Sequence, residues 1–167
     1  ILHAMRRRHT VEEYIDIINK LRRIRPDITI SSDFIVGFPG ESSKDFEQTL
    51  GLVEEIGFDE SFSFIYSPRP NTSAKELDDD VDLDEKKRRL EILQTLLKQQ
   101  ALAISRRMVG QQIRCLVTGI SKKDPGELQA RTENNRVVNF NSEGKDFVGQ
   151  FVHLKIVDAL PNSLRGV

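Results

Sequence analysis

The run Asp33–Glu41, which reads Asp-Phe-Ile-Val-Gly-Phe-Pro-Gly-Glu, constrains the fold of this chain more than any other stretch. Its apolar part is typical of a buried strand, and the Pro-Gly pair predicts a turn that leads into a helix. In α/β proteins, ligands gather at such turns. An ionised Asp is rarely buried alone, so a ligand or a neighbouring group must satisfy Asp33. A ligand-binding barrel or doubly wound sheet is favoured, and a structural Asp bonded to nearby backbone is the alternative.

Helical and strand patterns alternate around this run. Helices are predicted over 10–25, 42–56 and 82–108, and strands over 28–38 and 60–66. This order makes the connections βα-type and the sheet parallel. Asp33 falls on the polar face of its strand, which lines the lumen if the sheet forms a barrel. A solvent-facing antiparallel strand would alternate in the same way.

The residue composition of the chain changes from Gln112 onward, where short segments rich in β-branched residues are separated by turn residues. These segments cover 113–119, 128–132, 137–140, 151–158 and 163–167. They predict a small antiparallel barrel, so we place domains at 1–108 and 109–167. The barrel has a basic bias, and small barrels of this kind often bind single-stranded RNA. The alternative is a β module that only docks on the first domain.

Composition excludes several classes of protein. The chain has 167 residues, a formal net charge of −1 and one cysteine, Cys115, which excludes a disulfide framework or a thiolate cluster held within it. We expect Cys115 to be an inert core residue and the compartment to be the reducing cytoplasm. No apolar run approaches the ~20 residues of a membrane span, and no signal peptide is found. Because the chain begins with Ile1 rather than Met and its pattern of structural elements starts at once, we expect a fragment of a longer protein.

Several motifs resemble the radical SAM methylthiotransferases. They are the runs Met5–Thr10, Asp33–Glu41 and Tyr66–Pro70. The segments Gly119–Phe140 and Pro161–Gly166 resemble the C-terminal TRAM domain of the same enzymes. The resemblance implies an α/β part, the end of a TIM-like radical SAM barrel, followed by an all-β, OB-like TRAM barrel. Asn71 departs from the Gly that the family usually has after Arg-Pro.

The resemblance also implies S-adenosylmethionine and two [4Fe-4S] clusters as cofactors, although the cluster cysteines are absent from this chain. Asp33 is placed like the carboxylate that hydrogen-bonds the ribose of S-adenosylmethionine. Arg7 is placed like the Arg that meets its carboxylate, for which a guanidinium fork is well matched. Val36 and Gly37 are placed near the adenine. No catalytic residue or metal ligand is assigned within this chain.

The substrate implied by the resemblance is tRNA, at an isopentenylated adenosine next to the anticodon in the anticodon stem-loop, which receives a methylthio group. Arg69 is placed in the substrate-facing loop, with a plain surface charge as the alternative. The candidates for contact with tRNA in the barrel are Arg131, Asn135, Arg136 and Arg165. The rival functions are methylthiolation of a ribosomal-protein aspartate and a non-catalytic RNA-binding module. We expect the chain alone to be inactive and to self-associate through exposed barrel edges.

Overall fold

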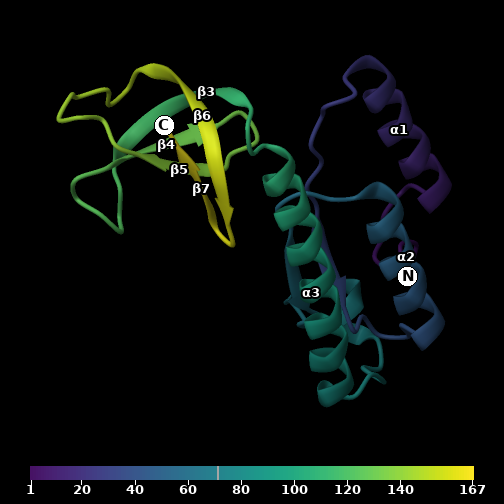
Figure 1. Ribbon diagram of the computed structural model, residues 1–167. Coiled ribbons are helices and arrows are strands. Elements are labelled where there is room, and N and C mark those ends of the chain that lie inside the picture. Colours follow the sequence, from purple (N-terminus) through teal and green to yellow (C-terminus); the bar gives the residue numbers. More distant parts are fainter. Residues whose placement is uncertain (71) are drawn as a thin grey trace. The chain divides into compact units, whose positions relative to one another are not determined.

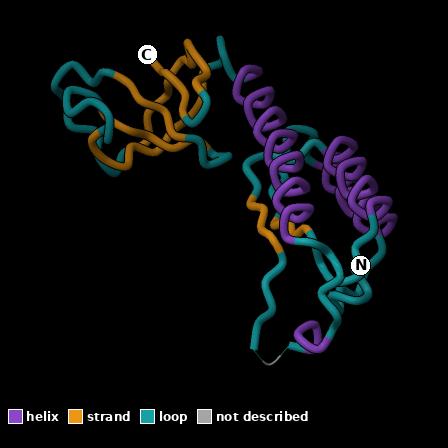
Figure 2. The backbone as a smooth tube through the Cα atoms, turned by 90° about the horizontal axis from the view of Figure 1, so that it is seen from below, coloured by secondary structure: helices purple, strands orange, loops and turns teal. Residues whose placement is uncertain are grey.

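The computed structural model of the chain describes residues 1–70 and 72–167, so Asn71 lies outside the described residues. The chain divides into two compact units, Ile1–Gln100 and Ala101–Val167. Helices prevail in the first unit and strands in the second (Figure 2). The division falls inside the long helix α3 (Leu83–Arg107), before the boundary predicted at the helix end. None of the described helices is long and apolar enough to cross a membrane.

The first unit has the predicted order of helices and strands (Figure 1). Its elements are α1 (Val11–Ile24), β1 (Asp33–Val36), α2 (Ser43–Ile56), β2 (Phe62–Ile65), the short 3-10 helix η1 (Ser73–Glu76) and the first part of α3. The Thr10 hydroxyl accepts from the Glu13 N–H and the Glu13 carboxylate accepts from the Thr10 N–H, so a capping box starts α1. A second capping box, Ser42 with Asp45, starts α2, and Gly57 ends it in the left-handed conformation.

β1 and β2 pair in parallel, which confirms the predicted connection. Both strands are shorter than predicted, because the ladder extends only over the four pairs from Asp33–Phe62 to Val36–Ile65. One face of this sheet packs into the core of the first unit. Val36, Val53 and Leu93 have no exposed surface there. Phe34 packs edge-on against the buried Phe58, with the ring centroids 5.2 Å apart.

The second unit is a closed five-stranded barrel with the order β3-β4-β5-β7-β6. Its strands are β3 (Gln112–Ile120), β4 (Leu128–Thr132), β5 (Val137–Phe140), β6 (Phe151–Leu160) and β7 (Ser163–Gly166). The prediction of a purely antiparallel barrel is wrong at one pair, since β5 and β7 run parallel. The β6–β7 hairpin returns the chain beside β5, and this contact closes the barrel and removes its free edges.

The barrel interior confirms the role expected of Cys115. The thiol lies fully buried among apolar side chains such as Val117 and Ile156. Burial raises the pKa of the Cys115 thiol to about 11, so the reactive thiolate is scarce at neutral pH.

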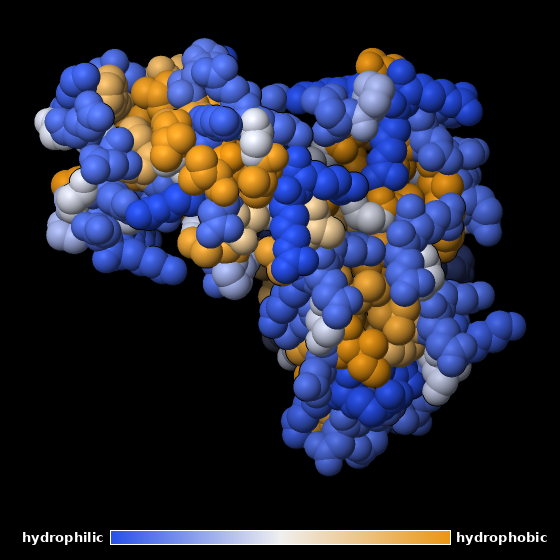
Figure 3. All heavy atoms as spheres, in the orientation of Figure 1, coloured by the Kyte–Doolittle hydropathy of each residue, from blue (hydrophilic) through white to orange (hydrophobic). Residues whose placement is uncertain are grey.

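Apolar side chains also reach the molecular surface as patches among polar ones (Figure 3).

Candidate functional site

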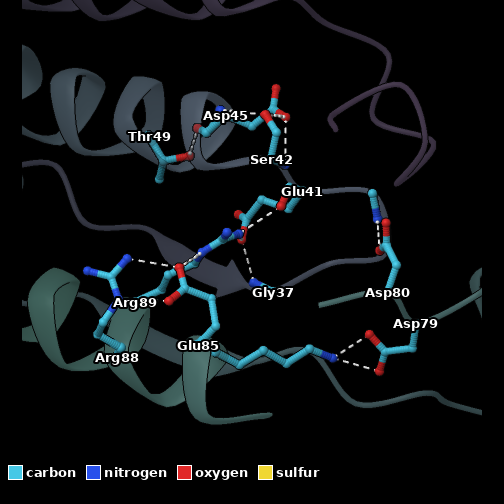
Figure 4. Close-up of polar contacts among 12 residues, drawn as sticks. Gly37, Glu41, Ser42, Asp45, Thr49, Asp79, Asp80, Glu85, Arg88 and Arg89 are labelled. Atoms are coloured by element: carbon cyan, nitrogen blue, oxygen red, sulfur yellow. Dashed lines mark hydrogen bonds and ion pairs between the residues drawn. The ribbon is translucent and has the colours of Figure 1, made fainter. Parts of the chain in front are cut away.

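A buried polar network holds the loop that follows β1. We call it the strand-end network, and it consists of Gly37, Glu41, Glu85 and Arg89 (Figure 4). The Gly37 N–H donates to Glu41 Oε2 at 2.6 Å, and Arg89 Nη1 donates to the same oxygen at 2.8 Å. The Glu41 and Arg89 side chains are 3% and 5% exposed. A pair this buried is tolerated only because each charge has its partner and further hydrogen bonds.

Glu85 extends the strand-end network toward solvent. Arg89 Nε donates to Glu85 Oε1 at 2.8 Å. Burial lowers the pKa of Arg89, but its hydrogen bonds to Glu85 and Glu41 outweigh burial and raise the pKa above its ordinary value. Hydrogen bonds from Arg88 and Arg89 lower the pKa of Glu85 to about 2. Glu85 therefore stabilises the fold above pH 4.5, its ordinary pKa, and this contribution disappears as the pH falls toward 2.

Two aspartates from the acidic stretch that precedes α3 fix the same loop. The Lys86 Nζ donates to both Asp79 oxygens, at 2.5 and 2.6 Å, and its stem packs against Gly37. The Gly40 N–H donates to Asp80 Oδ1 at 2.7 Å. Asp80 thus holds the turn after β1 directly, and Asp79 holds the Lys86 side chain that packs against Gly37.

The structure gives Gly37 a different reason to be glycine from the one expected. Its φ is +69°, and a Cβ at this position would lie 2.3 Å from Lys86 Cγ. The missing side chain thus admits the stem of Lys86. The Val36 side chain is fully buried in the core, so only its backbone could meet a ligand. Contacts of Val36 and Gly37 with a cofactor stay predictions.

Asp33 is the first residue of β1, and its side chain is exposed. The inference that this carboxylate is buried was wrong, because none of the described elements of the first unit covers its face of the sheet. We call this the open face, and it consists of Asp33, Ile35, Phe62 and Phe64. The three apolar side chains are 41%, 69% and 53% exposed, respectively. One carboxylate beside apolar surface suits a nucleoside, whose diol would bond the acid while its base covers the rings.

The structure does not bring all the predicted cofactor residues together. Gly37 follows the end of β1, about 13 Å from Asp33 at the usual rise of ~3.3 Å per residue. Arg7 is exposed in the N-terminal turn. It lines an open depression of about 600 Å³ together with His3, Arg6, Arg8 and Leu77. Arg69 is also exposed, and its carbonyl accepts from the Thr72 hydroxyl at 2.8 Å.

Among the barrel residues predicted to contact RNA, Arg131 and Asn135 lie together. Arg131 Nη1 donates to the Asn135 carbonyl at 2.8 Å and to its side-chain oxygen at 3.0 Å. Asn135 has a φ of 66°, so this pair shapes the turn between β4 and β5. Arg165 is half-exposed and forms an ion pair with Glu127 at 2.6 Å. RNA contacts of these three residues stay predictions.

The structure contradicts an RNA-contacting role for Arg136. This residue is only 3% exposed. Its Nε donates to Ser105 Oγ at 2.7 Å, and its Nη2 donates to the Ala101 carbonyl at 3.0 Å. The guanidinium therefore joins the barrel to the last turns of α3, where it satisfies buried acceptors and cannot reach a phosphate.

Sequence reasoning missed two groups of residues. Glu41 and Arg89 could have been found, because Arg89 continues the apolar stripe of α3 at helical spacing from Leu93 and Leu97. Arg114 and Phe151 stack in the barrel, with the guanidinium carbon 3.7 Å from the ring centroid. The alternation along 151–155 could have indicated that Phe151 and His153 share one face of a strand. The sequence does not reveal the register of β3 against β6, which brings Arg114 beside them.

The residues of this chain do not fit an iron–sulfur cluster. Across residues 1–70 and 72–167, no group of three or more His, Cys, Asp or Glu side chains is placed to hold a metal. The single cysteine is buried in the barrel.

Comparisons with known proteins match the two parts separately. The radical SAM superfamily matches residues 1–53, and the TRAM domain matches residues 106–167. The chain is 62% identical over 166 residues to a tRNA-2-methylthio-N(6)-dimethylallyladenosine synthase of Hahella chejuensis. It is 63% identical over 166 residues to the enzyme of the same name of Pseudomonas paraeruginosa. Each alignment covers 99% of this chain and 37% of the relative, so the chain spans little more than a third of their length.

Proposed function

We infer that this chain belongs to the radical SAM methylthiotransferase family. On this premise, we propose that the whole protein methylthiolates an isopentenylated adenosine of tRNA in the anticodon stem-loop. The relatives are named for the synthesis of 2-methylthio-N(6)-dimethylallyladenosine in tRNA, and nearly the full length of this chain aligns with them. A tRNA substrate also places the protein in the cytoplasm. The rival function within the family is methylthiolation of a ribosomal-protein aspartate.

The open face is the observation in the structure that carries this proposal. S-adenosylmethionine and the clusters, when bound, supply radical and sulfur chemistry, and this chain supplies positioning. Asp33 offers two acceptor oxygens to a vicinal diol, which are strong acceptors because they are charged. Ile35, Phe62 and Phe64 offer apolar surface for the base and exclude water around it. The strand-end network keeps the adjoining loop in one conformation, so the face is rigid before the ligand arrives.

The substrate is tested with the full-length protein and reconstituted clusters. Two candidate substrates are offered to the enzyme in separate reactions, namely tRNA that carries N6-isopentenyladenosine and the ribosomal protein. We expect mass spectrometry of digested nucleosides to show the 2-methylthio product and no change in the ribosomal protein. The 167-residue chain under the same conditions serves as the control, and it should give no product because one buried cysteine cannot ligate a cluster. Modification of the ribosomal protein alone would overturn the proposal.

The open face also predicts how the 167-residue chain behaves in solution. We expect it to self-associate, because among the described strands β1 and β2 pair only with each other, and because Phe62 and Phe64 are exposed. Sedimentation equilibrium should show dimers or larger species as concentration rises. The double variant Phe62→Ser/Phe64→Ser should shift the distribution to monomer. A wild-type chain that stays monomeric at high concentration contradicts the prediction.

A further inference from the structure

The outward surface of β3, β4 and β6 presents an aromatic ring among cations, and we propose that it stacks an unpaired base of RNA on Phe151. We call this surface the platform. It consists of Arg114, Leu116, Arg131, Phe151, His153 and Lys155. The inference rests on the proposed function, because it names the part of the barrel that would meet tRNA. Of these residues, only Arg131 was among the RNA contacts predicted from the sequence.

The strand register brings the platform together. Arg114 lies opposite His153, and Leu116 lies opposite Phe151, on the paired strands β3 and β6. Leu116 also lies opposite Arg131 of β4 on its other side. Alternation along each strand turns these side chains outward, since their neighbours Cys115 and Leu154 are buried in the core. The platform is therefore built on the rigid wall of a closed barrel rather than on a loop.

Phe151 has the exposure and the partner of a stacking residue. It is 57% exposed, although a phenylalanine gains from leaving water. The Arg114 guanidinium lies 3.7 Å from its ring centroid, which holds the ring by a cation–π contact and sets a second flat group beside it. Leu116 next to it is 36% exposed and extends the apolar surface. Bases of single-stranded nucleic acids stack on such aromatic and guanidinium planes.

Charge selects nucleic acid as the occupant of the platform. The ranges 112–118, 129–131 and 151–155 contain no acidic residue, whereas Arg114, Arg131 and Lys155 are cationic. The other candidate cations of the barrel are engaged differently, since Arg165 pairs with Glu127 and Arg136 is buried. Cations around an exposed ring fit a base flanked by phosphates. A base within a duplex is already stacked on both faces, so the fitting partner is an unpaired nucleotide.

The test measures binding of the full-length protein to an anticodon stem-loop RNA that carries 2-aminopurine at one loop position. Phe151→Leu keeps apolar bulk without the ring and should weaken binding roughly ten- to one-hundredfold, with loss of the 2-aminopurine quenching. Phe151→Trp keeps a ring and should retain affinity. Lys155→Gln should weaken binding modestly and lower the salt slope by about one, as loss of one phosphate contact does. Val148→Ala, an exposed apolar position of the barrel outside the platform, is the matched control.

The outcomes separate this inference from the function on which it rests. If the wild-type protein does not bind the stem-loop at all, the proposed tRNA function fails, and the platform fails with it. If the wild type binds and Phe151→Leu binds equally well, only the platform is overturned. A change in sedimentation with unchanged RNA affinity would show that the platform contacts a second protein chain, which also overturns the inference. Hydrogen exchange of β3 and β6 checks that each variant is folded.

Discussion

Replacing Arg89 with methionine should destabilise the first unit by about 3–5 kcal/mol, because Glu41 then remains as a buried carboxylate without its cation. The lost hydrogen bonds run to the carboxylate and the carbonyl of Glu41 and to the carboxylate of Glu85. The Gly37 N–H would still bond Glu41, but one amide dipole does not neutralise a charge. The effect should therefore exceed the loss of any single hydrogen bond in this unit.

Urea unfolding followed by tyrosine fluorescence measures this effect selectively. Both tyrosines of the chain, Tyr14 and Tyr66, lie in the first unit, and the chain contains no tryptophan. Arg88→Met is the matched control, since Arg88 also pairs with Glu85 but its side chain is 58% exposed. That variant should cost less than about 1 kcal/mol. The double variant Glu41→Met/Arg89→Met should recover most of the stability that Arg89→Met loses, because no unpaired charge then remains buried. Equal losses of stability in Arg88→Met and Arg89→Met would contradict a stabilising role of the buried Glu41–Arg89 pair.

Local signals in the sequence predicted the elements of the fold well. The ends of α1 and α2 and most barrel strands fall where expected. The reason is that their signals act within a few positions, as the capping residue Thr10, the helix-ending Gly57 and the turn residues of the barrel do. The parallel pairing of β1 with β2 followed from the order of elements. The parallel contact of β5 with β7 did not, because it depends on how the barrel closes in space.

Burial of charged residues was the part that local patterns could not supply. Arg136 and Arg165 look alike in the sequence, yet one is buried against Ser105 and the other is half-exposed beside Glu127. The difference arises from where α3 ends against the barrel. Asp33 shows the reverse case, since an apolar run predicted a buried strand but its face is uncovered. Of the candidate nucleoside site, only Asp33 was predicted from the sequence, while its exposure and its apolar neighbours came from the structure.

Asp33 is the proposed acceptor for the ribose of S-adenosylmethionine, and its replacement should have the largest effect on cofactor binding. Asp33→Ala removes both acceptor oxygens and should weaken binding roughly 100-fold, while Asp33→Asn keeps one uncharged acceptor and should lose about tenfold. Neither change should unfold the protein, because the side chain is exposed. Asp16→Asn, an exposed acid of α1, is the control and should bind as the wild type does.

The decisive measurement is calorimetric binding of S-adenosylhomocysteine and of its 2′-deoxy counterpart to the full-length protein and to Asp33→Ala. In the wild type, removal of the 2′-hydroxyl should weaken binding about tenfold, because one hydrogen bond to the carboxylate is lost. In Asp33→Ala both ligands should bind equally and weakly. Wild-type affinity of Asp33→Ala for S-adenosylhomocysteine, or an undiminished penalty for the 2′-deoxy ligand in that variant, would contradict the assignment of the open face to the nucleoside.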